Sequence, residues 1–142
     1  MQIVLVATDG SSAADRAVEV AAELAKTLNG TLLIVTVAGS LSGEEARQLV
    51  RAERDIADAL ESLSAEILLA AKDRARRLGV SAVKVQTAWG DPAEAVIEAA
   101  RREHADAIVV GRRGRGRLAG LLLGSVSQKI VSLAPCTVVV VP

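Results

Sequence analysis

Glycines and arginines gather between residues 111 and 125 (GRRGRGRLAGLLLGS), in a segment that holds no acidic residue. Glycine lets a backbone turn tightly and expose its N–H groups to a ligand, and arginine side chains pair with phosphate oxygens. Ser125 begins a stretch with helical spacing, so the free N–H groups and the positive dipole end of a helix are expected to point back at this loop. Together these features favour a loop that surrounds phosphate. The alternative is a basic loop that is simply exposed to solvent. For any single arginine, this alternative is the better interpretation.

The glycine spacing excludes two common phosphate-binding motifs. A Walker A loop needs a lysine immediately before its serine or threonine, whereas Ser125 follows Gly124. The dinucleotide motif G-x-G-x-x-G belongs after the first strand, where residues 9–11 of this chain are Asp-Gly-Ser. The spacing is instead Gly111-x2-Gly114-x9-Gly124-Ser125. This spacing is better evidence for a ligand than the positive charge of the loop.

The elements that would position this loop alternate between strand and helix. Apolar, β-branched runs predict strands, and helical spacing between capping residues and glycines predicts helices. The predicted strands are residues 2–8, 31–37, 81–88, 107–110 and 136–141, and the predicted helices are residues 12–28, 44–78, 92–103 and 125–133. This alternation predicts an α/β fold: one domain over residues 1–142, with a doubly wound five-stranded parallel sheet and helices on both faces.

Sheets of this kind bind ligands beyond the carboxyl ends of their strands. Asp9, Val37 and Gly111 all lie at such ends in the predicted topology, so the sequence places its unusual residues where a ligand would bind. Asp9 also fits a simpler role, because Asp-Gly-Ser after a strand often caps the next helix. The two roles are compatible.

Composition and charge exclude several function classes. Lys plus Arg and Asp plus Glu both number 17, so the chain lacks the basic excess of a general nucleic-acid binder. It has no Phe or Tyr and one Trp, which removes the stacking platforms of single-strand binders. No apolar run approaches the ~20 residues that a membrane helix needs. The lone Cys136 cannot form an internal disulfide, which fits a cytoplasmic location. We therefore expect neither nucleic acid nor a membrane as partner.

Side chains suited to catalysis are sparse. His104 is the only histidine, and it stands at a predicted helix end without a neighbouring residue that would complete a catalytic or metal site. Trp89 fits a packing role at the end of the third strand. Asp9 is a candidate carboxylate, but no general base is placed beside it, so we expect no catalytic residue and at most weak hydrolysis.

The glycine spacing resembles the signature of ATP-binding universal stress proteins, and relatives that do not bind ATP tend to lack it. Other pieces agree in order: VATDGSSAADRAV near the start, then GDPAEAVIEAA, ADAIVVG and GSVSQKIVSLAPCTVVVV. The resemblance covers nearly the whole chain, and only about residues 38–66 are uninformative. One departure is Thr137, where proline is common. The resemblance implies a Rossmann-like, adenine nucleotide alpha hydrolase-like fold.

The resemblance also implies roles for individual residues. Ala7, Thr8 and Asp9 would lie beside the ribose or adenine, and Val37 would meet adenine through its backbone. The residues that would surround ribose and phosphates are Gly111, Arg112, Arg113, Gly114, Arg115, Gly116 and Arg117. Those that would bind phosphates at the helix start are Gly124, Ser125, Val126 and Ser127. A Mg²⁺ or Mn²⁺ ion would accompany the phosphates, held mainly by them and by water.

Three functions compete at this stage. The leading hypothesis is a regulatory stress-response protein that binds ATP. The second is a homodimeric interaction module without nucleotide, because the last strand is an edge candidate and the resemblance implies a homodimer through Thr137 to Val141. The third is a slow ATPase, disfavoured by the missing Walker lysine.

Overall fold

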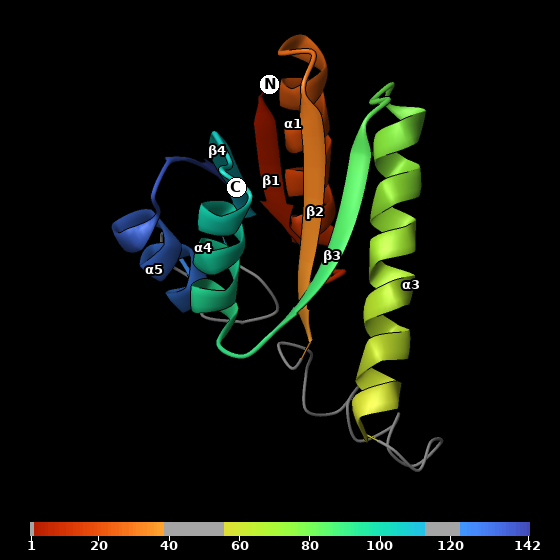
Figure 1. Cartoon of the computed structure of the whole chain (residues 1–142), viewed down its shortest axis with the longest axis vertical. Helices are drawn as coiled ribbons and strands as arrows, with labels where there is room; N and C mark the ends of the chain where they lie inside the picture. The colour runs from red at the N-terminus through yellow and green to blue at the C-terminus, as the bar shows by residue number, and fades with distance from the viewer. Residues whose placement is uncertain (1, 39–55, 113–122) are drawn as a thin grey trace.

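Strands and helices alternate along the chain, as the sequence predicts. The computed structural model describes residues 2–38, 56–112 and 123–142 (Figure 1). The strands within these residues are β1 (Ile3–Ala7), β2 (Thr31–Ala38), β3 (Val83–Trp89), β4 (Ala107–Gly111) and β5 (Thr137–Val141). The helices are α1 (Ser12–Thr27), α3 (Ile56–Arg77), α4 (Pro92–Arg102) and α5 (Ser125–Leu133). The elements start and end close to their predicted bounds, except that the first part of the helix predicted over 44–78 lies outside the described residues.

All strands run parallel in one sheet with the order β3-β2-β1-β4-β5. β1 lies at the centre, where Val4, Leu5 and Val6 pair with residues 32–34 of β2 on one side and with residues 107–109 of β4 on the other. The order of the strands therefore reverses at β1, which creates a topological switch point at its carboxyl end. The predicted doubly wound five-stranded α/β fold is confirmed.

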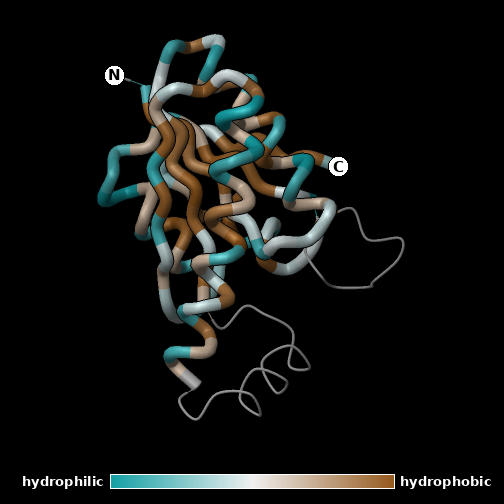
Figure 2. Tube along the Cα trace, turned by 90° about the vertical axis from the view of Figure 1, so that its right-hand side faces the viewer, coloured by the Kyte–Doolittle hydropathy of each residue, from teal (hydrophilic) through white to brown (hydrophobic). Residues whose placement is uncertain are grey.

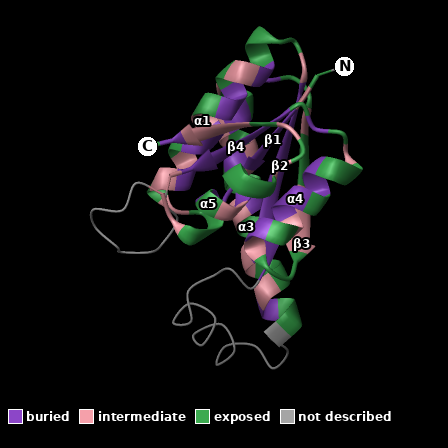
Figure 3. Ribbon diagram, turned by 90° about the vertical axis from the view of Figure 1, so that its left-hand side faces the viewer, coloured by how far each residue is buried: buried purple, intermediate pink, exposed green. Residues whose placement is uncertain are grey.

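Helices cover both faces of the sheet. α1 and α3 pack on one face over a buried cluster that includes Val4, Val6 and Ile34. α4 and α5 pack on the other face, over a cluster that includes Leu5 and Val35. The hydrophobic strands run through the middle of the molecule (Figure 2), and burial is concentrated there too (Figure 3). None of the helices in the described part of the chain is long and apolar enough to span a bilayer.

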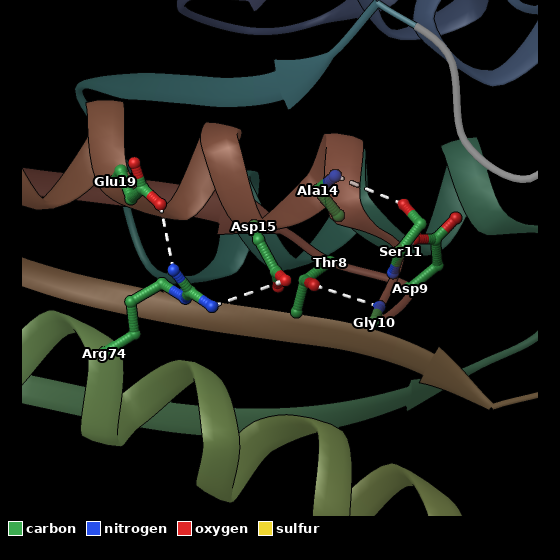
Figure 4. A network of polar contacts seen from close by, with 8 residues as sticks. All are labelled: Thr8, Asp9, Gly10, Ser11, Ala14, Asp15, Glu19 and Arg74. Carbon is green, nitrogen blue, oxygen red and sulfur yellow. Dashed lines mark hydrogen bonds and ion pairs between the residues drawn. The ribbon is translucent and has the colours of Figure 1, made fainter.

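Polar contacts join α3 to α1 and fix the start of α4. Arg74 of α3 contacts Glu19 of α1 at 2.9 Å and Asp15 of α1 at 3.5 Å (Figure 4). At the start of α4, a carboxylate oxygen of Asp91 accepts a hydrogen bond from the backbone N–H of Glu94 at 3.0 Å. An N-cap bond of this kind satisfies one of the amides that a helix leaves without an internal partner. α4 therefore begins at a fixed position.

Candidate functional site

A pocket of about 180 Å³ opens at the carboxyl ends of β1 and β2. Its walls come from the two strand ends on one side and from the first turns of α4 and α5 on the other. The lining residues are Ala7, Thr8, Asp9, Val35, Val37, Pro92, Val96 and Val126. Most of them are apolar, and Asp9 is the only ionisable side chain among them. A mainly apolar pocket with a few polar groups is the usual form of a small-molecule site.

The turn after β1 holds Asp9 at the edge of this pocket. The hydroxyl of Thr8 accepts a hydrogen bond from the N–H of Gly10 at 3.1 Å, and a carboxylate oxygen of Asp9 accepts one from the N–H of Ser11 at 2.9 Å. Ser11 in turn caps α1, since its hydroxyl accepts from the N–H of Ala14 at 3.2 Å (Figure 4). Gly10 has a φ of 81°, a conformation that glycine adopts readily. The expected capping by the Asp-Gly-Ser segment is thus present, and Ser11 supplies the cap.

The end of β4 is tied to the start of α5. The N–H of Gly124 donates to the carbonyl of Arg112 at 2.9 Å, and the N–H of Arg112 donates to the carbonyl of Val141 at 2.6 Å. The buried hydroxyl of Ser127 donates to the carbonyl of Gly111 at 2.7 Å and to that of Arg112 at 3.0 Å. These bonds hold the first turn of α5 against the end of β4.

The first turn of α5 presents backbone amides without a side-chain cap. Gly124 is the N-cap residue, no side-chain hydrogen bond caps the helix within the described residues, and no acidic residue stands in its first turn. The first amides of a helix lack internal partners, and they carry the positive end of the helix dipole. Val126 belongs to this turn and also lines the pocket. The pocket and the first turn of α5 therefore adjoin at Val126.

A lysine bridges α5 and α4 beside the pocket. The ammonium group of Lys129 lies 3.3 Å from a carboxylate oxygen of Asp91 and 3.1 Å from one of Glu94. The N–H of Glu94, followed by the bond from Lys129, lowers the pKa of Asp91. The hydrogen bond to Glu94 contributes most to raising the pKa of Lys129. Both shifts favour the charged forms of Asp91 and Lys129.

The structure brings together many of the residues that the resemblance singled out. Ala7, Thr8, Asp9, Val37 and Val126 line the pocket. Gly111, Arg112, Gly124, Ser125 and Ser127 lie at the junction of β4 and α5. The predicted residues that lie outside the described part of the chain are Arg113, Gly114, Arg115, Gly116 and Arg117. The hydroxyl of Ser127 is directed at two carbonyl groups, so in this structure it supports the loop.

Sequence analysis missed three lining residues, Val35, Pro92 and Val96. Val35 could have been found, because it lies two residues before Val37 and therefore on the same face of β2. Pro92 and Val96 are four residues apart and share one side of α4, but no local signal shows that this side meets the end of β1. The approach of α4 to β1 is a tertiary contact.

Ion-binding side chains are scarce in the described ranges. No group of three or more His, Cys, Asp or Glu side chains gathers there closely enough to hold a metal ion. The oxygen donors at the pocket suit a hard cation only in part, since Asp9 is the single carboxylate that lines it within residues 2–38, 56–112 and 123–142. A Mg²⁺ or Mn²⁺ ion would therefore need further oxygen ligands from a bound phosphate and from water.

Comparison with known proteins identifies the family. Residues 1–142 match the model of the "Universal stress protein family". A universal stress protein from Thermus aquaticus is 37% identical over 97% of this chain and 96% of its own length. Universal stress protein YxiE from Bacillus subtilis is 33% identical over 96% of each.

Solved structures show the same similarity. A universal stress protein solved in complex with cAMP is 33% identical, with a TM-score of 0.77 over 99% of this chain and 97% of that one. A family member from Burkholderia pseudomallei is 30% identical, with a TM-score of 0.71 over 99% and 96% of the two chains. With a family match over its whole length and relatives above 30% identity, this chain belongs to the universal stress protein family.

Proposed function

We propose that this protein binds ATP and acts as a nucleotide-dependent regulatory protein in a stress response. The observation that carries the proposal is the contact between an apolar pocket and the uncapped amides of α5. Adenine would occupy the pocket between Val37 and Val96, and the phosphates would reach the amides after Gly124. A similar protein that was solved with cAMP supports an adenine nucleotide as the class of ligand.

The polar groups around the pocket would orient the nucleotide. Asp9 would accept a hydrogen bond from a ribose hydroxyl, because it lines the pocket and a carboxylate is a hydrogen-bond acceptor. Arg112 would neutralise phosphate charge, as would the arginines at positions 113, 115 and 117, for which the sequence predicts the same role. A Mg²⁺ or Mn²⁺ ion would be held by phosphate oxygens and water.

Binding rather than catalysis is the proposed role. Among the described residues, Asp9 is the only ionisable side chain that lines the pocket, and none of them supplies a second such group to act as its partner acid or base. A single-turnover assay of phosphate release tests this point. Release at ordinary enzyme rates, ~1 s⁻¹ or more, would contradict a purely regulatory role.

Thermal unfolding with and without ligand tests nucleotide binding. ATP at about 100 times its dissociation constant stabilises a protein by about 2.7 kcal/mol, which corresponds to a rise in Tm of about 5–10 °C for a chain of this size. We expect a smaller rise with GTP, because the backbone groups of Val37 would meet a different ring edge in guanine than in adenine. The absence of an ATP-dependent rise would refute the proposal.

Two substitutions on α5 provide a matched test of the pocket. Val126→Trp would fill the pocket that Val126 lines, and we expect it to weaken ATP binding at least tenfold by calorimetric titration. Val131→Trp adds the same bulk to the same helix at an exposed residue outside the pocket lining, and it should bind like the parent. Gly124→Val tests the phosphate end of the site. Gly124 has an ordinary φ of −75° that valine can adopt, so the substitution should not strain the backbone.

A homodimer through β5 (Thr137–Val141) accompanies this proposal. β5 is an edge strand, and Val138, Val139 and Val140 in it are only partly buried. Edge strands offer unpaired backbone groups to a second chain. Sedimentation should show a dimer that Val139→Lys dissociates, and a monomeric parent would contradict it. We further propose a cytoplasmic location, which fits the single cysteine.

A further inference from the structure

Two walls of the pocket belong to different helices, α4 and α5, and the ammonium group of one lysine joins these helices. Pro92 and Val96 of α4 and Val126 of α5 line the pocket. Asp91 directly precedes Pro92, and Lys129 follows Val126 by three residues, or nearly one turn. The contacts of Lys129 with Asp91 and Glu94 therefore lie immediately beside the two helical walls.

Other contacts hold α5 to the sheet. They do not set the distance between α5 and α4, which depends on the side chains that lie between the two helices. Ser127 and Gly124 attach the start of α5 to the end of β4, and Ile130 is buried in the core. These contacts set where α5 sits along β4. The bridge through Lys129 is the polar link that reaches from α5 to the N-cap of α4 among the described residues.

Loss of the lysine would change the bridge in a defined way. Asp91 and Glu94 would lose the ammonium group that they share, and with it the two ion pairs that join the start of α4 to α5. Asp91 would keep its bond to the backbone N–H of Glu94, so α4 would keep its cap. Apolar side chains of the shared buried cluster, such as Ile97 and Ile130, would then hold α4 to α5 without the ion pairs, and we expect the pocket between Pro92 and Val126 to widen.

We propose that Lys129 is a positioning residue that sets the width of the nucleotide pocket through its bridge to Asp91 and Glu94. This inference rests on the proposed nucleotide binding and assigns a determinant of its affinity. Lys129 touches no part of the pocket itself, so its effect reaches the ligand through the helix walls. Binding of the nucleoside part of the ligand, and not only of its phosphates, therefore depends on Lys129.

Calorimetric titration with adenosine and with ATP tests the inference. Lys129→Met should weaken the binding of both ligands by a similar factor of about five. This is the largest effect that partly exposed ion pairs usually have. Lys129→Arg should bind nearly as the parent does, because a guanidinium group can reach both carboxylates. The charge exchange Lys129→Glu with Glu94→Lys should recover part of the affinity that Lys129→Glu alone loses. Rescue of this kind is not expected from a general loss of stability.

A control variant removes a positive charge from α4 at a residue outside the bridge. Arg101→Met breaks an ion pair within that helix, between Arg101 and Glu98 at 3.3 Å, and leaves the bridge intact. It should bind adenosine as the parent does. Three results would overturn the inference: equal adenosine binding by Lys129→Met and the parent, a loss for ATP but not for adenosine, or an equal loss in Arg101→Met. If the parent binds neither ligand, the proposed function fails first, and the inference falls with it.

Discussion

Replacing Thr36 by valine should stabilise the protein. Thr36 lies in β2 two residues after Ile34, on the sheet face that α1 and α3 cover, and its side chain is 1% exposed. Its hydroxyl oxygen has no hydrogen-bond partner among the described residues. A buried hydroxyl of this kind lost its bonds to water on folding and gained none in exchange.

The size of the effect follows from this burial. A buried polar group without a partner costs about 1–3 kcal/mol, and an apolar group of the same shape avoids the cost. Valine has nearly the shape of threonine and is at least as favourable in a strand. We expect a gain of about 1–2 kcal/mol in the free energy of unfolding, equivalent to a rise in Tm of about 3–6 °C for a chain of this length.

Urea unfolding followed by circular dichroism measures the change, and Thr8→Val is the matched control. Thr8 is also buried, at 5% exposure, but its hydroxyl accepts a hydrogen bond from the N–H of Gly10. The control should therefore lose about 1 kcal/mol. If Thr36→Val destabilises the protein as much as Thr8→Val does, the hydroxyl of Thr36 has a partner, such as a buried water, and the reasoning is wrong.

Three further predictions concern stability. Gly30→Ala should cost about 2 kcal/mol by urea unfolding, because an added Cβ would lie 2.5 Å from the carbonyl oxygen of Gln2. His104→Gly should raise stability by about 0.5 kcal/mol in the same assay, because His104 has a φ of 55° at the end of α4, where glycine avoids the steric cost. The pKa of Asp91 lies below its ordinary value of 3.8, so the stabilisation is complete above the unfolded-state pKa and is lost as pH falls through the folded-state pKa. Between about pH 7 and pH 3, the Tm of the parent should therefore fall more than that of Asp91→Asn.

The sequence predicts the fold almost completely, because each element carries its own local signal. The β-branched runs of β1 and β2 and the Asp91-Pro92 start of α4 need no knowledge of the rest of the chain. The strand-end rule then places Asp9 and Val37 at the pocket, where the structure has them. These two residues are predictable because strand direction alone decides their position.

The remaining features of the site depend on contacts between elements. Val96 reaches the pocket because of how α4 is rotated on the sheet, and no local pattern encodes that rotation. The hydroxyl of Ser127 donates to the carbonyls of Gly111 and Arg112, which spacing does not reveal, and the phosphate contact expected of Ser127 stays a prediction. The bridge from Lys129 joins residues 38 and 35 positions apart in sequence, so spacing cannot reveal it. The nucleotide contacts predicted for residues 113–117 stay predictions.

The central place of β1 in the sheet has a consequence for how the molecule is assembled. During synthesis, β1, β2 and β3 leave the ribosome first, so the strand residues of the pocket are synthesised before those that α4 and α5 supply. The free edge of β1 must then wait for β4, which begins about a hundred residues later. A ligand held between the two parts would join the early and the late section of the chain, and it would stabilise only the completed protein.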